Sequence, residues 1–214
     1  LQNLITNAWK NHMDEIVYQS ATALAASIRR KELTSSEVVD TYLQRIKKVN
    51  PAINAVVQLV EERALEEARA ADRDLHAGHI HGPLHGVPMT IKDSFDTAGI
   101  ISTGGSLARK DFVPTQDASV VARLRGAGGI LMGKSNTPEL TLGWATEKLV
   151  YGRTSNPYDT TRTPSATSGG AAAIIAAGGS PLDIGSDTGG SIREPAHVCG
   201  IAGIKPTACR VPRT

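Results

Sequence analysis

The chain has 214 residues, of which 40% are hydrophobic, and its 23 basic and 21 acidic residues leave a formal net charge of +2. This length is enough for one or two domains with an apolar core. Because the charge forms neither a basic block nor an acidic tail, we expect small-molecule partners and neither nucleic acid nor an anionic membrane. Two cysteines are too few for a disulfide framework, and no apolar run approaches the length of a membrane span. We therefore expect a cytoplasmic protein.

The N-terminal part of the chain predicts an arm followed by a helical hairpin. Residues 1–19 show weak periodicity, and we expect a poorly packed arm there, ahead of a single domain over residues 20–214. A helical periodicity begins near Ser20. The sequence Thr34-Ser35-Ser36-Glu37 is a capping box for a second helix, which we expect Asn50-Pro51 to end.

A strand and a charged helix are predicted next. Ile53–Val60 is rich in valine and isoleucine, which favours a strand, and the alanine-rich segment Glu61–Ala77 favours a helix. Four histidines then lie within ten residues, namely His76, His79, His81 and His85. They do not form the H-E-x-x-H pattern of a helical zinc site, so we expect a solvent-exposed loop and no metal.

A lysine lies in the next predicted strand, Gly86–Asp93, where Val87, Met89 and Ile91 alternate with polar residues. A lysine such as Lys92 is usually a solvated residue of an edge strand, and the alternation alone favours that interpretation. If Lys92 were buried instead, desolvation would lower the pKa of its amine and make it a usable base.

The segment Gly128–Ser135 matches the phosphate-loop pattern G-x-x-x-x-G-K-S literally. A phosphate loop needs a strand before it and a helix after it. Here a helix is predicted before it, over Asp117–Arg125, and Ile130–Met132 has the composition of a strand. We therefore predict a strand and no ATP site.

The alternation of helices and apolar strands favours an α/β sandwich that contains parallel strands. The following segment is rich in loops, and Trp144 there is either a pocket wall or a core residue.

Two turns of small residues, Ser165–Gly170 and Gly185–Ser191, flank the apolar run Ala171–Ala177, which is too uniformly apolar for a surface helix. Glycines and hydroxyls in a turn let several backbone N–H groups converge on a ligand oxygen, and Ser191 is the best nucleophile candidate. The common serine-hydrolase pattern G-x-S-x-G is absent, and His197 is not paired with a recognisable acidic partner.

Four motifs together resemble the amidase signature family, in the family's order. They are Gly86–Asp93, Gly133–Glu139, Ser168–Ala173 and Gly185–Thr207, and the resemblance covers about Ser20 to the C-terminus. It implies an α/β/α sandwich around a large mixed β-sheet, no cofactor and a Ser-cisSer-Lys triad. Family members continue well beyond the last residue here, so we expect only the N-terminal portion of the domain.

The resemblance also implies roles for individual residues. Ser191 is the nucleophile, Lys92 is the terminal base, and the bridging residue after a cis peptide is Thr167, because the family's bridge lies 24 residues before the nucleophile. The backbone N–H groups of Thr188, Gly189, Gly190 and Ser191 form the oxyanion hole. Asp187 and Arg193 brace the turn, and Ser168 lies beside the proton relay.

The first turn departs from the family pattern. The family usually reads Gly-Gly-Ser-Ser-Gly-Gly, whereas this chain has Ser165-Ala166-Thr167 at the first three positions. Threonine keeps the hydroxyl of the bridge but adds a methyl group that restricts its torsion.

The leading hypothesis is an amidohydrolase that acts on a linear amide, ester or carbamate. The alternatives are the amidase subunit of a tRNA-dependent amidotransferase, which needs partner subunits, and a ligand-binding protein with an impaired relay. The oligomeric state stays open, with a homodimer as one alternative.

Overall fold

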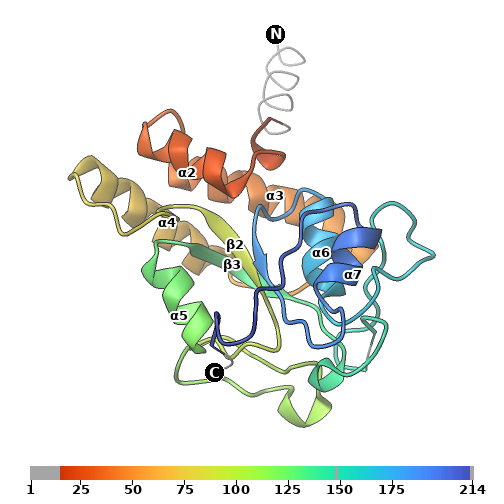
Figure 1. The fold of residues 1–214 in the computed structure, drawn as a ribbon. Coiled ribbons are helices and arrows are strands. Elements are labelled where there is room, and N and C mark those ends of the chain that lie inside the picture. Colours follow the sequence, from red (N-terminus) through yellow and green to blue (C-terminus); the bar gives the residue numbers. More distant parts are fainter. Residues whose placement is uncertain (1–14, 148, 213–214) are drawn as a thin grey trace.

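The computed structural model describes residues 15–147 and 149–212, and their centre is a four-stranded sheet (Figure 1). The strand order is β1 (Val56–Leu59), β3 (Ile130–Ser135), β2 (Pro88–Lys92) and β4 (Asp183–Ile184). β1 is antiparallel to β3, whereas β2 is parallel to both β3 and β4. The predicted α/β class with a mixed sheet is therefore confirmed.

Helices cover both faces of this sheet. They are α2 (Ala21–Arg29), α3 (Ser35–Ile53), α4 (Glu61–His76), α5 (Ser119–Gly126), α6 (Gly169–Ala176) and α7 (Arg193–Val198), with two short 3-10 turns at Leu107–Arg109 and Glu139–Thr141. Side chains of consecutive strand residues point to opposite faces. In β3, Ile130 and Met132 accordingly join one apolar cluster, while Leu131 joins the other. The sheet thus lies between two apolar layers.

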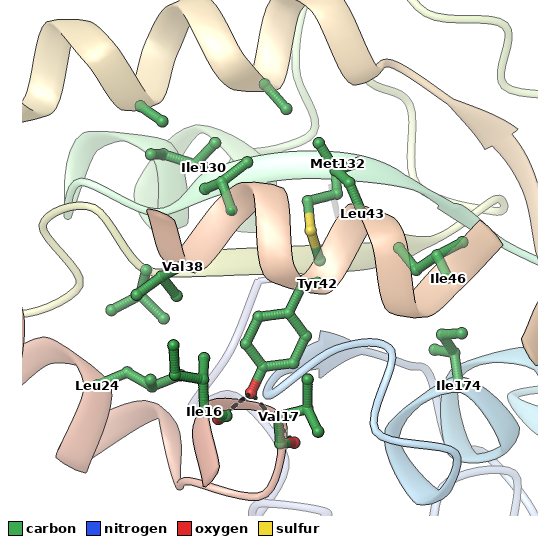
Figure 2. Packing of buried hydrophobic residues seen from close by; sticks show 14 of the residues in the cluster. Ile16, Val17, Leu24, Val38, Tyr42, Leu43, Ile46, Ile130, Met132 and Ile174 are labelled. Atoms are coloured by element: carbon green, nitrogen blue, oxygen red, sulfur yellow. Dashed lines mark hydrogen bonds between the residues drawn. The ribbon is translucent and has the colours of Figure 1, made fainter. Parts of the chain in front are cut away.

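The larger cluster packs α2, α3, α4 and α6 against one face of the sheet (Figure 2). Tyr42 of α3 lies in its middle and is fully buried. Its hydroxyl lies 3.3 Å from the carbonyl oxygens of both Ile16 and Val17. The predicted capping box is also present, since Thr34 Oγ1 accepts a hydrogen bond from the N–H of Glu37 at 3.0 Å. The smaller cluster packs α5 against the opposite face through Val120 and Val121.

Two boundaries differ from the sequence prediction. Residues 1–14 of the predicted arm lie outside the described residues, but Ile16 and Val17 are buried in the larger cluster. The division into an arm and a domain stays a prediction, although the packed chain begins before Ser20. The predicted strand at Ile53 begins instead at Val56, because α3 continues through Pro51 to Ile53.

Asn50 organises the end of α3, just beyond a proline. Its side-chain Oδ1 accepts hydrogen bonds from the N–H groups of Ala55 and Val56, both at 2.8 Å. Its carbonyl oxygen accepts the N–H of Asn54, whose left-handed conformation ends the helix. Proline lacks an N–H and costs the helix one hydrogen bond, and the asparagine supplies local bonds beyond it.

His85 is buried, so the expected exposed loop is wrong at this residue. Its Nε2 lies 3.0 Å from the carbonyl oxygen of Ala71, and its Nδ1 accepts the N–H of His81 at 3.2 Å. The imidazole ring of His81 stacks on that of His85 with 5.4 Å between centroids. Buried polar groups need such partners, which a count of histidines in a sequence does not reveal.

Candidate active site

Lys92 ends β2 and is fully buried. β2 lies between β3 and β4, so it is an interior strand with apolar clusters on both faces. The interpretation of Lys92 as a solvated edge residue is therefore wrong. The alternation of residues within β2 does not show which strands lie on either side of it, so it could not distinguish an edge strand from an interior strand.

Three hydroxyl groups surround the amine of Lys92. Its Nζ donates to Thr167 Oγ1 at 2.7 Å, to Ser186 Oγ at 2.9 Å and to Ser168 Oγ at 3.0 Å. Burial lowers the pKa of Lys92 to about 7, while the negative charges of Asp183 and Asp187 act in the opposite direction. Near neutral pH a substantial fraction of this amine is therefore uncharged and able to accept a proton.

The turn that carries Thr167 is shaped by two residues in the left-handed region, Ser165 at φ 69° and Ala166 at φ 45°. The N–H of Ala166 donates to Trp144 O at 2.9 Å, and its carbonyl accepts from Thr146 Oγ1 at 2.8 Å. All peptide bonds of the described residues are trans, so the cis peptide implied before Thr167 is not found. The left-handed pair reverses the chain instead and still directs the Thr167 hydroxyl toward Lys92.

The turn from Gly185 to Ser191 is organised around the carboxylate of Asp187. Its two oxygens accept Arg193 Nη2 and Nε at 2.9 and 3.0 Å, as expected for a bracing ion pair. This pairing holds the pKa of Asp187 well below its usual range. The same carboxylate accepts the N–H of Gly190 at 2.8 Å. That N–H is thus engaged within the turn, and the contribution of Gly190 to the oxyanion hole stays a prediction.

The hydroxyl-bearing residues open onto a cavity of about 220 Å³. It is lined by Thr141, Leu142, Gly143, Trp144, Thr167, Ser186, Thr188, Gly189 and Ser191. One wall is polar and contains Thr167, Ser186 and Ser191. Leu142 and Trp144 supply apolar parts of the lining, and both residues are exposed, so Trp144 is a pocket wall rather than a core residue.

Ser191 is joined to the first turn through the backbone. The N–H of Ser168 donates to the carbonyl oxygen of Ser191 at 3.2 Å. Within the part of the chain that the structure describes, no hydrogen bond joins the side chains of Ser191 and Thr167, although both line the cavity. The structure thus brings Lys92, Thr167 and Ser191 together at one site.

Comparison with known proteins identifies the family of the chain. The sequence profile of the amidase family matches residues 37–214. The chain belongs to the amidase family. It is 45% identical over 195 residues to a glutamyl-tRNA(Gln) amidotransferase subunit of Acidothermus cellulolyticus, covering 91% of this chain and 39% of that protein. The corresponding protein of Rhodopirellula baltica is 47% identical over 194 residues, with the same two coverages.

Solved amidase structures share the fold. The peptide amidase of Stenotrophomonas maltophilia superimposes with a TM-score of 0.85 at 36% identity, covering 92% of this chain and 42% of that one. The chain therefore spans about two fifths of the length of the family members that it matches.

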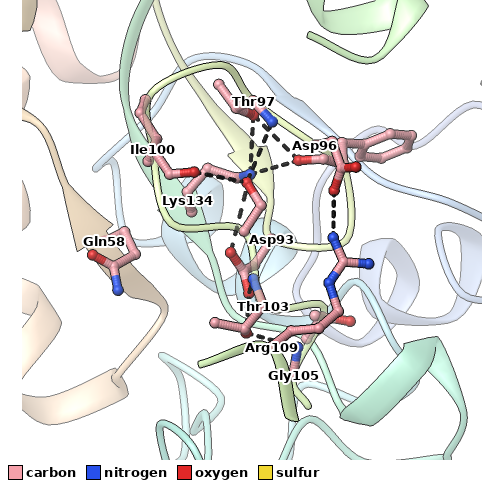
Figure 3. Close-up of polar contacts among 12 residues, drawn as sticks. Gln58, Asp93, Asp96, Thr97, Ile100, Thr103, Gly105, Arg109 and Lys134 are labelled. Atoms are coloured by element: carbon pink, nitrogen blue, oxygen red, sulfur yellow. Dashed lines mark hydrogen bonds and ion pairs between the residues drawn. The ribbon is translucent and has the colours of Figure 1, made fainter. Parts of the chain in front are cut away.

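The amidase motif around Lys134 explains the literal match to a phosphate loop. Gly133 and Lys134 belong to the buried strand β3, as predicted. The Lys134 amine donates to Phe95 O, Ser102 Oγ and Thr97 Oγ1 at 2.6, 2.9 and 3.0 Å, and it lies 4.0 Å from Asp93 (Figure 3). Burial lowers the pKa of Lys134 to about 8. Its three donors are all used in holding the loop after β2, so none is left for a phosphate.

Two site residues were missed by sequence reasoning. Ser186 contacts Lys92 directly, and its only signal was its position inside the turn from Gly185 to Ser191. Asp183 of β4 accepts a 2.6 Å hydrogen bond from Thr90, and its Oδ1 is buried without a hydrogen-bond partner. Burial raises the pKa of Asp183 to about 7. No local pattern distinguished this aspartate.

The described residues contain no group of three or more histidine, cysteine or acidic side chains arranged to hold a metal ion. The histidine segment instead makes pairwise contacts, such as that of His81 Nε2 with Asp74 at 2.7 Å. Among the described helices, none is both long and apolar enough to cross a membrane.

Proposed function

We propose that this amidase-family chain carries the catalytic centre of an enzyme that hydrolyses the C–N bond of a small linear amide, with esters and carbamates as related substrates. One observation carries the proposal. The buried amine of Lys92 has a pKa of about 7 and donates to Thr167 at the wall of a cavity that Ser191 also lines. A neutral amine, a bridging hydroxyl and a serine are the groups that base-assisted acyl transfer requires.

The first half-reaction forms an acyl-enzyme. Ser191 Oγ attacks the carbonyl carbon while its proton passes to Thr167 Oγ1, and the Thr167 proton passes to neutral Lys92. The tetrahedral intermediate then expels the amine as the C–N bond breaks, and the proton held by Lys92 returns to the leaving nitrogen. This return is needed because an amide anion is a very poor leaving group. Water releases the acid by the same steps in reverse.

The negative oxygen of the intermediate needs donors, and we assign this role to the backbone N–H groups of Thr188, Gly189 and Ser191, because these residues line the cavity. The N–H of Gly190 donates to Asp187 and would have to leave that bond in order to join this set. The contact between Ser191 and Thr167 is expected to form with substrate, because catalytic hydrogen bonds are often long without a ligand and shorten in the complex.

A second candidate function is the amidase subunit of a tRNA-dependent amidotransferase. The 44–47% identity to glutamyl-tRNA(Gln) amidotransferase subunits supports it. This activity would use the same Ser191 and Lys92 chemistry but would require partner proteins. Copurification of two further chains with the native protein would favour this candidate, and amide hydrolysis by the purified protein alone would favour the first. A homodimer and a cytoplasmic location stay predictions.

The proposal is tested with two substitutions at the cavity. Ser191→Ala should abolish amide hydrolysis and covalent labelling by a fluorophosphonate serine probe. Thr167→Val keeps the shape of the bridge but removes its hydroxyl, and should lower kcat/KM by at least about 100-fold, the usual minimum for a proton-transfer group. Thr167→Ser, the matched control, should stay active. Full amide hydrolysis by the Ser191→Ala variant would refute the proposed reaction through a Ser191 acyl-enzyme. Ligand binding by the unmodified protein, without labelling by the probe, would support a non-catalytic binding protein.

A further inference from the structure

The hydrogen bonds around Lys92 indicate which hydroxyl groups can move protons. A protonated lysine has three N–H donors and no acceptor. Thr167, Ser168 and Ser186 each accept one of these donors, so the protonated amine is fully bonded. When Lys92 is neutral it has two N–H donors and one lone pair. One of the three hydroxyls must then donate its proton to that lone pair.

Ser168 is not suited to this exchange. Its own hydroxyl donates to the carbonyl oxygen of Ser186 at 3.2 Å, and its oxygen also accepts the N–H of Ser186 at 3.3 Å. Ser168 is moreover buried and does not line the cavity. It can therefore hold the amine in place, but it offers no path from Lys92 to a bound substrate.

Ser186 has both properties that Ser168 lacks. Its Oγ lies 2.9 Å from Lys92 Nζ, and the residue lines the cavity together with Thr188 and Ser191. Within the described part of the chain its hydroxyl proton is not donated to any protein acceptor. Lys92 thus has two hydroxyl neighbours that open onto the cavity, Thr167 and Ser186.

We propose that Ser186 is a second proton carrier on Lys92, which delivers a proton to the leaving nitrogen of an amide substrate. The inference rests on the proposed amide hydrolysis at Ser191. In the tetrahedral intermediate, Lys92 gives one N–H proton to Ser186 Oγ while the Ser186 hydroxyl gives its own proton to the nitrogen. The C–N bond then breaks and the neutral amine leaves. Thr167 collects the proton of Ser191, so neither hydroxyl has to reverse its direction between the two transfers.

A proton carrier of this kind should matter for amides but not for esters with activated leaving groups. An anilide nitrogen needs a proton in order to leave, whereas 4-nitrophenolate leaves without one. Ser186→Ala should therefore lower kcat/KM for butyryl 4-nitroanilide by at least about tenfold more than for 4-nitrophenyl butyrate, in line with the size of general-acid effects. Ser186→Thr retains the hydroxyl and should restore the amide-to-ester ratio.

Ser168→Ala is the matched control, because Ser168 also contacts Lys92 but does not face the cavity. It should lower both activities by the same factor. Ester hydrolysis by the Ser186→Ala variant also reports that this variant is folded. Equal losses on amide and ester in Ser186→Ala would overturn the proposal and leave Ser186 as a residue that only positions Lys92. A Ser191→Ala variant that keeps both activities would instead overturn the proposed function itself.

Discussion

At the scale of single residues, the central feature is an amine that is kept from ionising fully. Lys92 lies in the sheet interior, where burial opposes its positive charge more strongly than Asp183 and Asp187 favour it. Three hydroxyls are its hydrogen-bond partners, and none of them carries a charge. Had one of these partners been a carboxylate, the pKa of Lys92 would be higher and its use as a base at neutral pH would be lost.

This pKa predicts the pH dependence of the reaction. Lys92 accepts a proton only when neutral, so kcat/KM should rise with pH and reach half of its maximum near pH 7. Asp183→Asn removes a negative charge that raises the pKa of Lys92, so the half-maximum should move to lower pH. Initial rates between pH 5 and 9 measure both. A kcat/KM that still rose tenfold per pH unit between pH 8 and 9 would contradict a proton acceptor with a pKa near 7.

At the scale of elements, α6 positions the first turn by approaching the sheet closely. A Cβ on Gly170 would lie 2.4 Å from the N and 2.5 Å from the O of Asn136, just beyond the end of β3. This close approach brings the start of the helix, and with it Thr167 and Ser168, beside Lys92. The glycine is therefore needed for its lack of a side chain.

We predict that Gly170→Ala destabilises the protein by about 1–3 kcal/mol, the usual cost of overpacking, and lowers amide hydrolysis as Thr167 shifts. Gly126→Ala in α5 is the control, since a Cβ there meets nothing within 4 Å and alanine favours a helix. Urea unfolding measures the free energy of each variant. If Gly170→Ala were as stable and active as Gly126→Ala, the close approach of α6 would not be needed for the site.

At the scale of the whole molecule, a buried polar cluster joins the sheet to the cavity wall. Lys134 holds the loop after β2 through Phe95, Thr97 and Ser102 (Figure 3). The same loop holds the cavity wall, because Gly104 O accepts the N–H of Leu140 at 2.7 Å. Hydrogen bonds thus connect the sheet, through this loop, to the segment that supplies Thr141 and Leu142 to the cavity lining.

Removing the lysine should be costly. Lys134→Met leaves the buried charge of Asp93 without its cation, and we expect a loss of about 3–5 kcal/mol in the free energy of unfolding at pH 7. The double variant Lys134→Met/Asp93→Asn removes both charges and should lose less than the single variant. Urea unfolding of the two variants tests this. A double variant less stable than Lys134→Met would show that the ion pair is not the source of the effect.

Much of the fold could be predicted from local patterns. The helix over Glu61–His76 and the strand at Ile130 follow from periodicity and composition, which act between near neighbours in the chain. Among the candidate site residues, Lys92, Thr167 and Ser191 lie in motifs that can be recognised from the sequence alone. The position of Pro51 misled the helix prediction, because α3 continues through it for one more half-turn and ends at Ile53.

The sequence by itself determined the family, the α/β class and the choice of residues proposed for the chemistry, since these depend on residue type and spacing. The tertiary structure decided whether that chemistry is available. β4 lies parallel beside β2 and brings Asp183 and Ser186 to Lys92 from more than 90 positions along the chain. Strand order placed Lys92 in the interior, where desolvation lowers its pKa. Burial and long-range strand pairing depend on neighbours that are distant in sequence, so no local pattern in this chain could predict them.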